Sequence, residues 1–248
     1  MNTATLIRQR IWTKLDAVAI ADSRFDKRFS EVIPDFVGSD AATDRIMALP
    51  CAQSGRYVFV TPDNCLVELR RRLLQLGCTL VVSTYGIHRG FFLLEPGMVP
   101  PGQELFAAWL DGLEHFGRPI SLAEIGARGR FDYLVTGASA VSRDGVRFGK
   151  GHGYFDMEWG MFTELGIVDE EVPVIAIVHD VQVVEDKLTP SPTDIIVDMI
   201  ATPSAMIEVK RSHPRPRGIK WPLLDAAAIA ATPPLQELQR MQALLPPA

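Results

Sequence analysis

The sequence lacks features that would point to several broad classes of protein. It has only three cysteines, Cys51, Cys65 and Cys78, with no C-x-x-C pair, which fits reduced thiols in a protein core. Its formal net charge of -5 offers no general excess of positive charge for nucleic acid. No apolar run approaches the length needed to cross a bilayer. We therefore expect a cytoplasmic protein, with neither nucleic acid nor a membrane as its partner.

What the chain does contain is an alternation of strand-like and helical patterns. With 248 residues, of which 47% are hydrophobic, it is long enough to bury one large core. Strand-like runs occur at 56–62, 79–85, 132–142, 173–180 and 194–203. Helical patterns occur at 4–19, where Leu6, Ile7, Ile11 and Leu15 share a face, and at 63–77, 102–117 and 154–166. This order predicts an α/β protein with a largely parallel sheet covered on both faces.

A change in composition near residue 210 suggests how the chain is organised. We expect residues 1–210 to form the α/β unit and residues 211–248 to form a basic, proline-rich arm with C-terminal helices that pack on it. The favoured interpretation of the arm is a solvated segment that docks these helices. The alternative is a ridge that binds a polyanionic substrate tail. The arm's basic residues are Lys210, Arg211, Arg215, Arg217 and Lys220.

The stretch RFGKGHGYFD, from Arg147 to Asp156, is the strongest local signal of function. Its alternate glycines fit neither the Walker loop nor the Rossmann fingerprint, whose spacings differ. Alternate glycines nevertheless allow successive backbone N–H groups to converge on an anion, and the helix that follows points its positive dipole end to the same place. Side-chain donors would come from Arg147, Lys150 and His152, and Asp156 lies close enough to hold magnesium on a polyphosphate. The alternative is a tight turn that only needs glycine for a positive φ.

These residues resemble the signature of the 5-formyltetrahydrofolate cyclo-ligase (methenyltetrahydrofolate synthetase) family. The likeness continues in the preceding strand DYLVTGASAVS, in PVIAIVHDVQ and TDIIVDMIATP, and in the opening LIRQRIW. It is closest to the divergent branch with synthetase-like domains, in which GKG.GY.D.E and a C-terminal RP.GI.W..L recur. The resemblance implies a three-layer α/β/α fold related to ribose-phosphate isomerases and CoA-transferases.

The resemblance also implies a reaction and a set of site residues. The reaction would be the ATP- and Mg2+-dependent closure of 5-formyltetrahydrofolate, a folate-like small molecule, to 5,10-methenyltetrahydrofolate with release of ADP and phosphate. Arg147 and Lys150 would be the catalytic cations, Tyr154 would meet the substrate, and Asp156 and Asp194 would bind the metal. The residues implied to hold ATP are Arg8, Arg147, Phe148, Gly149, Lys150, Gly151, His152, Gly153 and Tyr154.

Departures from the family pattern keep other functions open. Ala4 stands where the family has a lysine, Met157 stands where arginine is common, and Thr193 replaces a histidine before Asp194. Each change removes a hydrogen-bond donor, or a side chain that would fix the position of another group, from the part of the implied site where the ATP phosphates would bind. One alternative is a paralogue that uses ATP on another heterocycle, and another is an inactive, nucleotide-binding regulatory module. The oligomeric state is left open.

Overall fold

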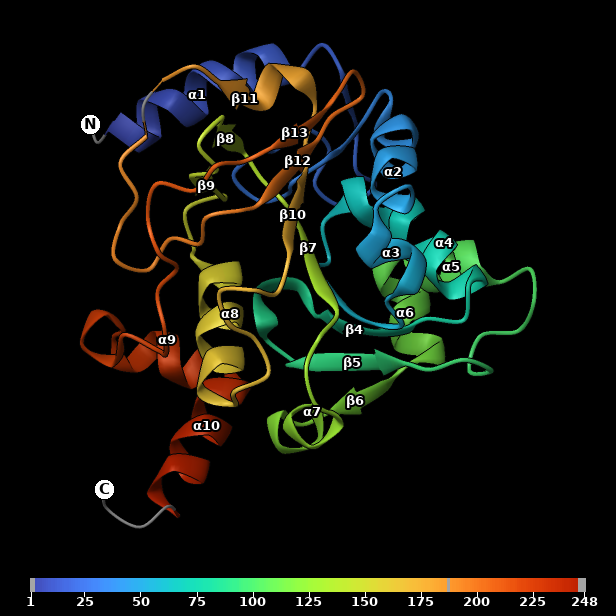
Figure 1. Cartoon of the computed structure of the whole chain (residues 1–248), viewed down its shortest axis with the longest axis vertical. Helices are drawn as coiled ribbons and strands as arrows, with labels where there is room; N and C mark the ends of the chain where they lie inside the picture. The colour runs from blue at the N-terminus through green and yellow to red at the C-terminus, as the bar shows by residue number, and fades with distance from the viewer. Residues whose placement is uncertain (1–2, 187, 245–248) are drawn as a thin grey trace.

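A computed structural model describes residues 3–186 and 188–244, and an eight-stranded sheet runs through its centre (Figure 1). The strand order is β13-β12-β10-β7-β3-β4-β5-β6. The strands are β3 Tyr57–Val60, β4 Thr79–Ser83, β5 Phe91–Leu94, β6 Arg118–Ile120, β7 Tyr133–Gly137, β10 Val174–Ile177, β12 Met199–Ala201 and β13 Met206–Glu208. From β12 to β4 the neighbours are parallel, and β13, β5 and β6 add antiparallel edges. The predicted mainly parallel α/β architecture is confirmed.

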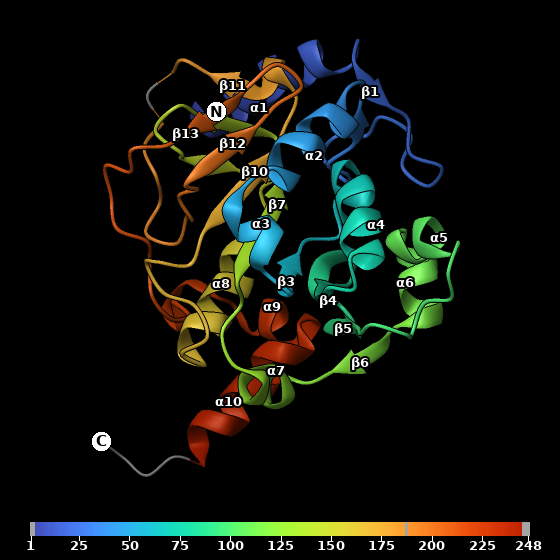
Figure 2. The same ribbon diagram turned by 45° about the vertical axis from the view of Figure 1, so that its right-hand side comes forward.

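Successive residues of a strand point to opposite sides of the sheet, so the sheet has two apolar faces. Helices cover both of them. Phe59 and Val81 belong to one hydrophobic cluster, while Val58 and Leu80 belong to another. Figures 1 and 2 show the helices of the two clusters on opposite sides of the strands. The first cluster includes residues of α7 Leu122–Arg128, α8 Tyr154–Glu164 and α10 Pro233–Ala243, and α9 Ala226–Ala231 packs against it. The second includes residues of α2 Ser39–Met47, α3 Pro50–Ser54, α4 Val67–Gln75 and α6 Leu110–Phe116.

The opening helix packs on a smaller sheet rather than on the large one. This sheet has the order β11-β8-β9, with β8 Ala140–Ser142, β9 Arg147–Phe148 and β11 Val183–Val184, and a separate ribbon pairs β1 Ala19–Ile20 with β2 Asp35–Phe36. From α1, Thr3–Leu15, Ile7 and Ile11 join Val146 and Phe148 in a third hydrophobic cluster. Leu6 was predicted on the same inward face, but it is 49% exposed. The contact of α1 with β9 brings the helix next to the glycine stretch.

Other parts of the fold differ from what the sequence predicted or were not predicted. The edge strands β5 and β6 were not predicted, and the single helix expected at 102–117 is divided into α5, Glu104–Ala108, and α6. Trp109 between them has an extended backbone, and a Cβ on Gly112 would lie 1.9 Å from the carbonyl oxygen of Phe106. The two helices therefore fold back on each other at a distance that only glycine allows. Leu76 follows the end of α4 and is exposed, so it does not continue that helix's apolar face.

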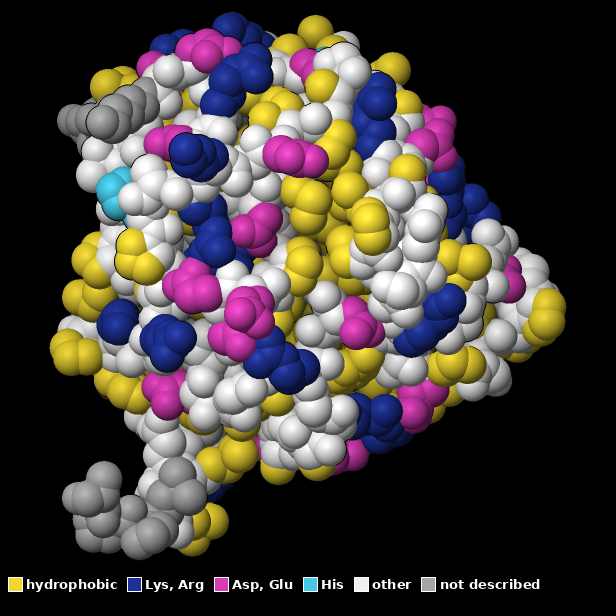
Figure 3. Space-filling model, viewed as in Figure 1, with side chains coloured by type: hydrophobic (Ala, Val, Ile, Leu, Met, Phe, Trp, Pro, Cys, Tyr) yellow, Lys and Arg dark blue, Asp and Glu magenta, His cyan; other side chains and the backbone are white. Residues whose placement is uncertain are grey.

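None of the helices described is both long and apolar enough to cross a membrane. On the face shown in Figure 3, basic and acidic side chains are intermixed rather than gathered into one positive patch. Of the cysteines, Cys65 and Cys78 are buried, Cys51 is half-buried, and all three are unpaired thiols.

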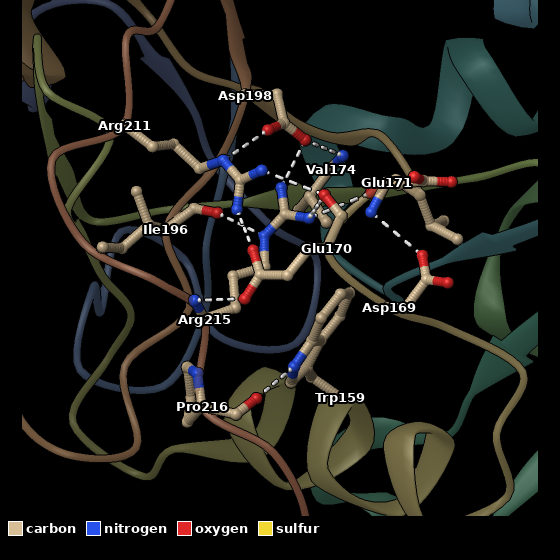
Figure 4. A network of polar contacts seen from close by, with 11 residues as sticks. Trp159, Asp169, Glu170, Glu171, Val174, Ile196, Asp198, Arg211, Arg215 and Pro216 are labelled. Atoms are coloured by element: carbon tan, nitrogen blue, oxygen red, sulfur yellow. Dashed lines mark hydrogen bonds and ion pairs between the residues drawn. The ribbon is translucent and has the colours of Figure 1, made fainter.

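The C-terminal arm is anchored by a buried arginine (Figure 4). Arg215 donates to the carbonyl oxygens of Ile196 at 2.9 Å and Val172 at 3.0 Å, and it pairs with Asp198. Its guanidinium lies 5.0 Å from the ring centroid of Trp159, whose Nε1 donates to the carbonyl oxygen of Pro216. These contacts neutralise part of the arm's charge and fix its path across α8. We propose that residues 1–210 and the described part of 211–248 fold as one unit; residues 245–248 lie outside the described residues.

We expect Arg215→Ala to lower the free energy of unfolding by about 2–4 kcal/mol, since it leaves the carbonyl oxygens of Ile196 and Val172 without their side-chain donor and removes one of the two arginines that pair with Asp198. Arg217→Ala is the matched control, because Arg217 lies in the same arm and is exposed. Urea denaturation followed by circular dichroism measures both. Equal stability of the two variants would contradict the anchoring role of Arg215.

Candidate functional site

The glycine stretch forms the loop between β9 and α8. It leaves the strand after Phe148, and α8 begins at Tyr154, as the sequence predicted. Gly151 has φ +115° and Gly153 has φ +67°, conformations that favour glycine. Within the described part of the chain, no hydrogen bond uses the backbone N–H groups of residues 149–153. The loop therefore keeps its backbone donors available beside the positive end of a helix dipole.

Two pockets lie on either side of this loop and share it as a wall. The first, which we call the arm pocket, encloses about 310 Å³ and extends from Arg8 and Asp194 to the C-terminal arm at Lys220. The second, the ring pocket, is named for Phe25, Tyr85 and Tyr154 and encloses about 70 Å³. Residues common to both linings are Arg147, Gly149, His152, Gly153 and Asp156. A group held at the loop would therefore face both pockets.

Arg147 is the buried cation of the shared wall. Its side chain is only 4% exposed, it donates to the carbonyl oxygen of Gly137 at 3.2 Å, and its guanidinium lies 4.8 Å from the ring centroid of Phe155. One terminal nitrogen lies 3.7 Å from Asp156 Oδ1, whereas Nε has no hydrogen-bond partner among the described residues. A buried donor without a partner is unusual in a folded protein. Arg147 therefore retains donor capacity for a ligand.

The arm pocket brings together a second arginine and two carboxylates. Arg8 Nε donates to the carbonyl oxygen of Gly149 at 2.8 Å, which ties α1 to the loop. Burial lowers the pKa of Arg8, and Asp194 acts against this effect. Asp156 Oδ1 accepts the N–H of Ile195 at 3.0 Å, and Asp194 Oδ2 accepts the N–H of Ser191 at 2.7 Å. Each carboxylate thus has one oxygen held by the backbone and a second oxygen without a recorded hydrogen bond among the described residues.

These carboxylates suit a magnesium ion better than they suit a metal held by protein alone. The described residues contain no group of three or more His, Cys, Asp or Glu side chains placed to hold a metal. Mg2+ on a polyphosphate needs only one or two carboxylates and takes its other ligands from phosphate and water. Burial raises the pKa of Asp156, and the neighbouring Arg147 opposes this and favours the ionised form. The donor set fits magnesium bound together with a phosphate ligand.

The remaining predicted residues divide between the two pockets. Phe148 lines the arm pocket, and Arg8 lies 5.4 Å from its ring centroid. Lys150 lines the ring pocket, where it donates to the carbonyl oxygen of Glu31 at 2.9 Å and lies 4.6 Å from the ring centroid of Tyr85, and its contact with phosphate stays a prediction. Burial lowers its pKa. Tyr154 also lines the ring pocket, and its ring stacks on His152.

Sequence reasoning missed two parts of this site. The arm was interpreted as a docking segment or an anion ridge, yet Pro216, Gly218, Ile219 and Lys220 line the arm pocket together with Leu223 and Leu224. Glu158, one helical position past Met157, was not singled out either. Its side chain is buried in the ring pocket, and Oε2 has no hydrogen-bond partner within the described chain. A glutamate placed among the apolar residues of a helix was the available signal.

Comparison of the sequence with known proteins shows which family the chain belongs to. Residues 1–203 match the model described as the 5-formyltetrahydrofolate cyclo-ligase family. The chain belongs to this family. Its cyclo-ligase relatives catalyse a ligation, and the arm, whose residues 216–224 help to line the arm pocket, lies beyond the matched region.

Individual relatives agree with the family match. The human methenyltetrahydrofolate synthase domain-containing protein is 35% identical over 240 residues, covering 94% of this chain and 60% of that protein. The bovine protein of the same name is 31% identical over 242 residues, covering 95% of this chain and 62% of that protein. The chain thus spans about three fifths of the length of these curated relatives. The solved 5,10-methenyltetrahydrofolate synthetase of Aquifex aeolicus shares the fold, with TM-score 0.53, 16% identity and coverage of 86% of this chain and 95% of that one.

The ionisation of Glu158 makes a testable contribution to stability. Burial raises the pKa of Glu158 from 4.5 to about 8. Between these values the folded protein keeps a proton that the unfolded chain has lost, so stability falls as the pH rises through this window. We expect Glu158→Gln to remove this slope, so that the variant gains stability relative to the wild type up to about pH 8 and the difference then levels off.

Denaturant unfolding at several pH values measures this effect. Glu171→Gln is the control, because Glu171 is exposed at the surface. A stability difference between wild type and Glu158→Gln that does not vary with pH would show that Glu158 is ionised in the folded protein.

Proposed function

We propose that the protein is an ATP- and Mg2+-dependent cyclo-ligase that converts 5-formyltetrahydrofolate, or a closely related formylated folate, to the methenyl form with release of ADP and phosphate. The observation that carries the proposal is the shared wall: the glycine loop and Arg147 face two pockets of different chemistry. A ligase that activates one substrate with the phosphate of another needs both substrates to meet at one anion-binding surface.

The arm pocket has the composition expected of a nucleotide site. Its volume of about 310 Å³ lies at the lower end of the range of small-molecule sites. Arg8, Arg147 and the loop N–H groups would hold the phosphates. Apolar side chains for a base or ribose are available farther along the lining, namely Met157, Trp159, Ile219, Leu223 and Leu224. The arm would therefore close the nucleotide site opposite the loop.

The ring pocket would receive the folate. The formyl oxygen would attack the terminal phosphorus of ATP at the shared wall, and ADP would leave into the arm pocket. The folate nitrogen N10 would then attack the formyl carbon and lose its proton. Inorganic phosphate would leave from the same carbon. Arg147 neutralises charge on the transferred group from its buried position, and the loop N–H groups fix its orientation. Magnesium would neutralise phosphate oxygens, and Asp156 and Asp194 are the side chains that would hold it.

A nucleotide-binding module without catalysis is the second candidate. It is favoured by Ala4, in the first turn of α1, and by the position of Lys150, which is turned toward Glu31. Both reduce the positive charge expected near the transferred phosphate. A paralogue that acts on another heterocycle would retain the same nucleotide pocket.

The decisive experiment measures ADP release by purified protein with ATP and Mg2+, with and without 5-formyltetrahydrofolate. We expect release that requires the folate and an absorbance change that reports the methenyl product. Nucleotide binding without release would support the inactive module. Folate-independent release, or release triggered by another formylated heterocycle, would support the paralogue instead.

Nucleotide binding can be tested separately from turnover. We expect Arg8→Ala to weaken ATP binding about tenfold or more, because it removes a cation from the phosphate end of the arm pocket. Arg10→Ala is the matched control: Arg10 lies on the same helix, is exposed and pairs with Asp186 outside the pocket. Calorimetric titration with ATP and Mg2+ measures both variants. Equal affinities of the two variants for ATP would show that the arm pocket is not the nucleotide site. Arg147 is a less suitable probe, since its burial beside Asp156 links it to folding.

A further inference from the structure

The C-terminal arm follows a fixed path where it passes the arm pocket. Its backbone lies against Gly160 of α8, where a Cβ would stand 2.7 Å from Ile219 Cδ1 and 3.1 Å from the carbonyl oxygen of Gly218. The N–H of Gly218 donates to Thr163 Oγ1 at 2.8 Å. The next N–H, that of Ile219, donates to Glu164 Oε1 at 3.2 Å. These contacts make the arm a built wall of the pocket.

Beyond this contact, one apolar side chain of the arm lines the pocket and stays exposed. Trp221 and Leu224 pack against the first hydrophobic cluster, so the 3₁₀ turn η4, Trp221–Leu223, is held on both sides. Leu223 between them is 64% exposed and lines the arm pocket. Apolar surface that a ligand removes from water contributes to binding in proportion to the area covered. Leu223 is therefore placed to stabilise a ligand with an apolar face, such as a nucleoside.

The same segment brings a cation to the pocket wall. Two other basic residues of the arm, Arg211 and Arg215, both pair with Asp198. Lys220 is exposed, lines the pocket and pairs with no carboxylate among the described residues. Its Nζ donates to the carbonyl oxygen of Arg217 at 2.9 Å, which uses one of the three N–H donors of a lysine. Lys220 therefore keeps its positive charge and two donors for an anion in the pocket.

The distance between the arm and the glycine loop indicates which part of a nucleotide Lys220 would meet. The loop joins α8 at Tyr154, whereas the arm crosses the helix at Gly160, six residues farther on and roughly 9 Å along its axis. A ligand that contacts both must be extended. With its terminal phosphate at the loop, the phosphates nearest its nucleoside would lie toward Lys220, and the nucleoside itself would lie beside Leu223.

We propose that Lys220 binds the phosphates nearest the nucleoside of a nucleotide in the arm pocket and that Leu223 covers the nucleoside. The inference rests on the proposed function, in which this nucleotide is ATP. It extends the binding site to a segment beyond residues 1–203, which the family model matches. Lysine binds phosphate as a point charge, so the contact needs no exact orientation of the side chain.

The charge is tested by calorimetric titration of the full chain with ATP, ADP and inorganic tripolyphosphate, each with Mg2+. We expect Lys220→Ala to weaken all three about tenfold or more, and ATP and ADP by the same factor, because it removes a contact with phosphates that both nucleotides carry. Lys220→Arg keeps the charge and should stay within about threefold of the wild type. Arg217→Ala is the matched control, since Arg217 is exposed in the same arm but does not line the pocket.

The apolar contact is tested in the same titrations. We expect Leu223→Ser to weaken ATP and ADP about fivefold and to leave tripolyphosphate unchanged, because tripolyphosphate has no nucleoside to cover. Since Leu223 and Lys220 are exposed, their variants should unfold at the same urea concentration as the wild type. Circular dichroism checks this, so a loss of affinity can be assigned to the pocket.

The outcomes separate this inference from the proposed function. Equal ATP affinity of Lys220→Ala and the wild type, with ADP release that still requires 5-formyltetrahydrofolate, overturns the inference and leaves the cyclo-ligase proposal in place. A loss confined to ATP also overturns it, because Lys220 would then meet the terminal phosphate. The same holds for an equal loss in Arg217→Ala, which would reflect the general charge of the arm.

Two further results concern the nucleoside and the reaction. Weaker tripolyphosphate binding by Leu223→Ser overturns the role given to Leu223. If the variants show the expected affinities but the wild type releases no ADP with the folate, the inference is supported and the proposed reaction fails. A wild type that binds none of the three ligands overturns the inference.

Discussion

The buried pair of Arg147 and Asp156 is the interaction on which the arrangement of the site depends. Arg147 belongs to β9 in the small sheet, Asp156 lies in the first turn of α8, and the loop of glycines joins them. Arg147 also reaches the carbonyl oxygen of Gly137 at the end of β7 in the large sheet. One guanidinium thus connects both sheets and the helix. At 3.7 Å the ion pair is not closely hydrogen-bonded, so Arg147 can donate to a phosphate without losing a hydrogen bond to Asp156.

The pockets follow from how other elements pack around this pair. Ile7 and Ile11 fix α1 on the small sheet, and this places Arg8 against Gly149. On the other side, Arg215 holds the arm across Trp159, so that Ile219 and Lys220 complete the wall of the arm pocket. Neither the opening helix nor the arm belongs to the central sheet. The nucleotide site that we propose is therefore assembled from the opening helix and the arm around the glycine loop, and Arg147 and Phe148 of the small sheet join its lining.

The sequence predicted the local elements well, but it predicted less well how these elements pack together. The loop and the start of α8 could be predicted because glycine spacing and helical periodicity are local properties. The direction of Lys150 could not, since it is set by Glu31 and Tyr85, more than 60 residues away in the sequence. The same applies to the arm, whose charges suggested an exposed segment while Arg215 is buried against Asp198. The division of α5 from α6 depends on one close approach at Gly112, which no periodicity reports.

Glu158 shows that a binding site can be recognised by buried polar groups that lower the stability of the folded protein. A helix that packs Phe155, Trp159 and Phe162 into the core would be more stable with an apolar residue in place of a buried carboxyl. The same holds for Arg147 Nε, which is buried without a partner in the described chain. Such costs are tolerated where a ligand supplies the missing hydrogen bonds, and sites that bind polar ligands are commonly less stable than they would be if apolar. That Arg147 Nε and Glu158 Oε2 lie in one pocket without partners among the described residues is therefore stronger evidence for a ligand than the pocket's shape alone, because packing explains a cavity more readily than it explains unpaired polar groups at the same place.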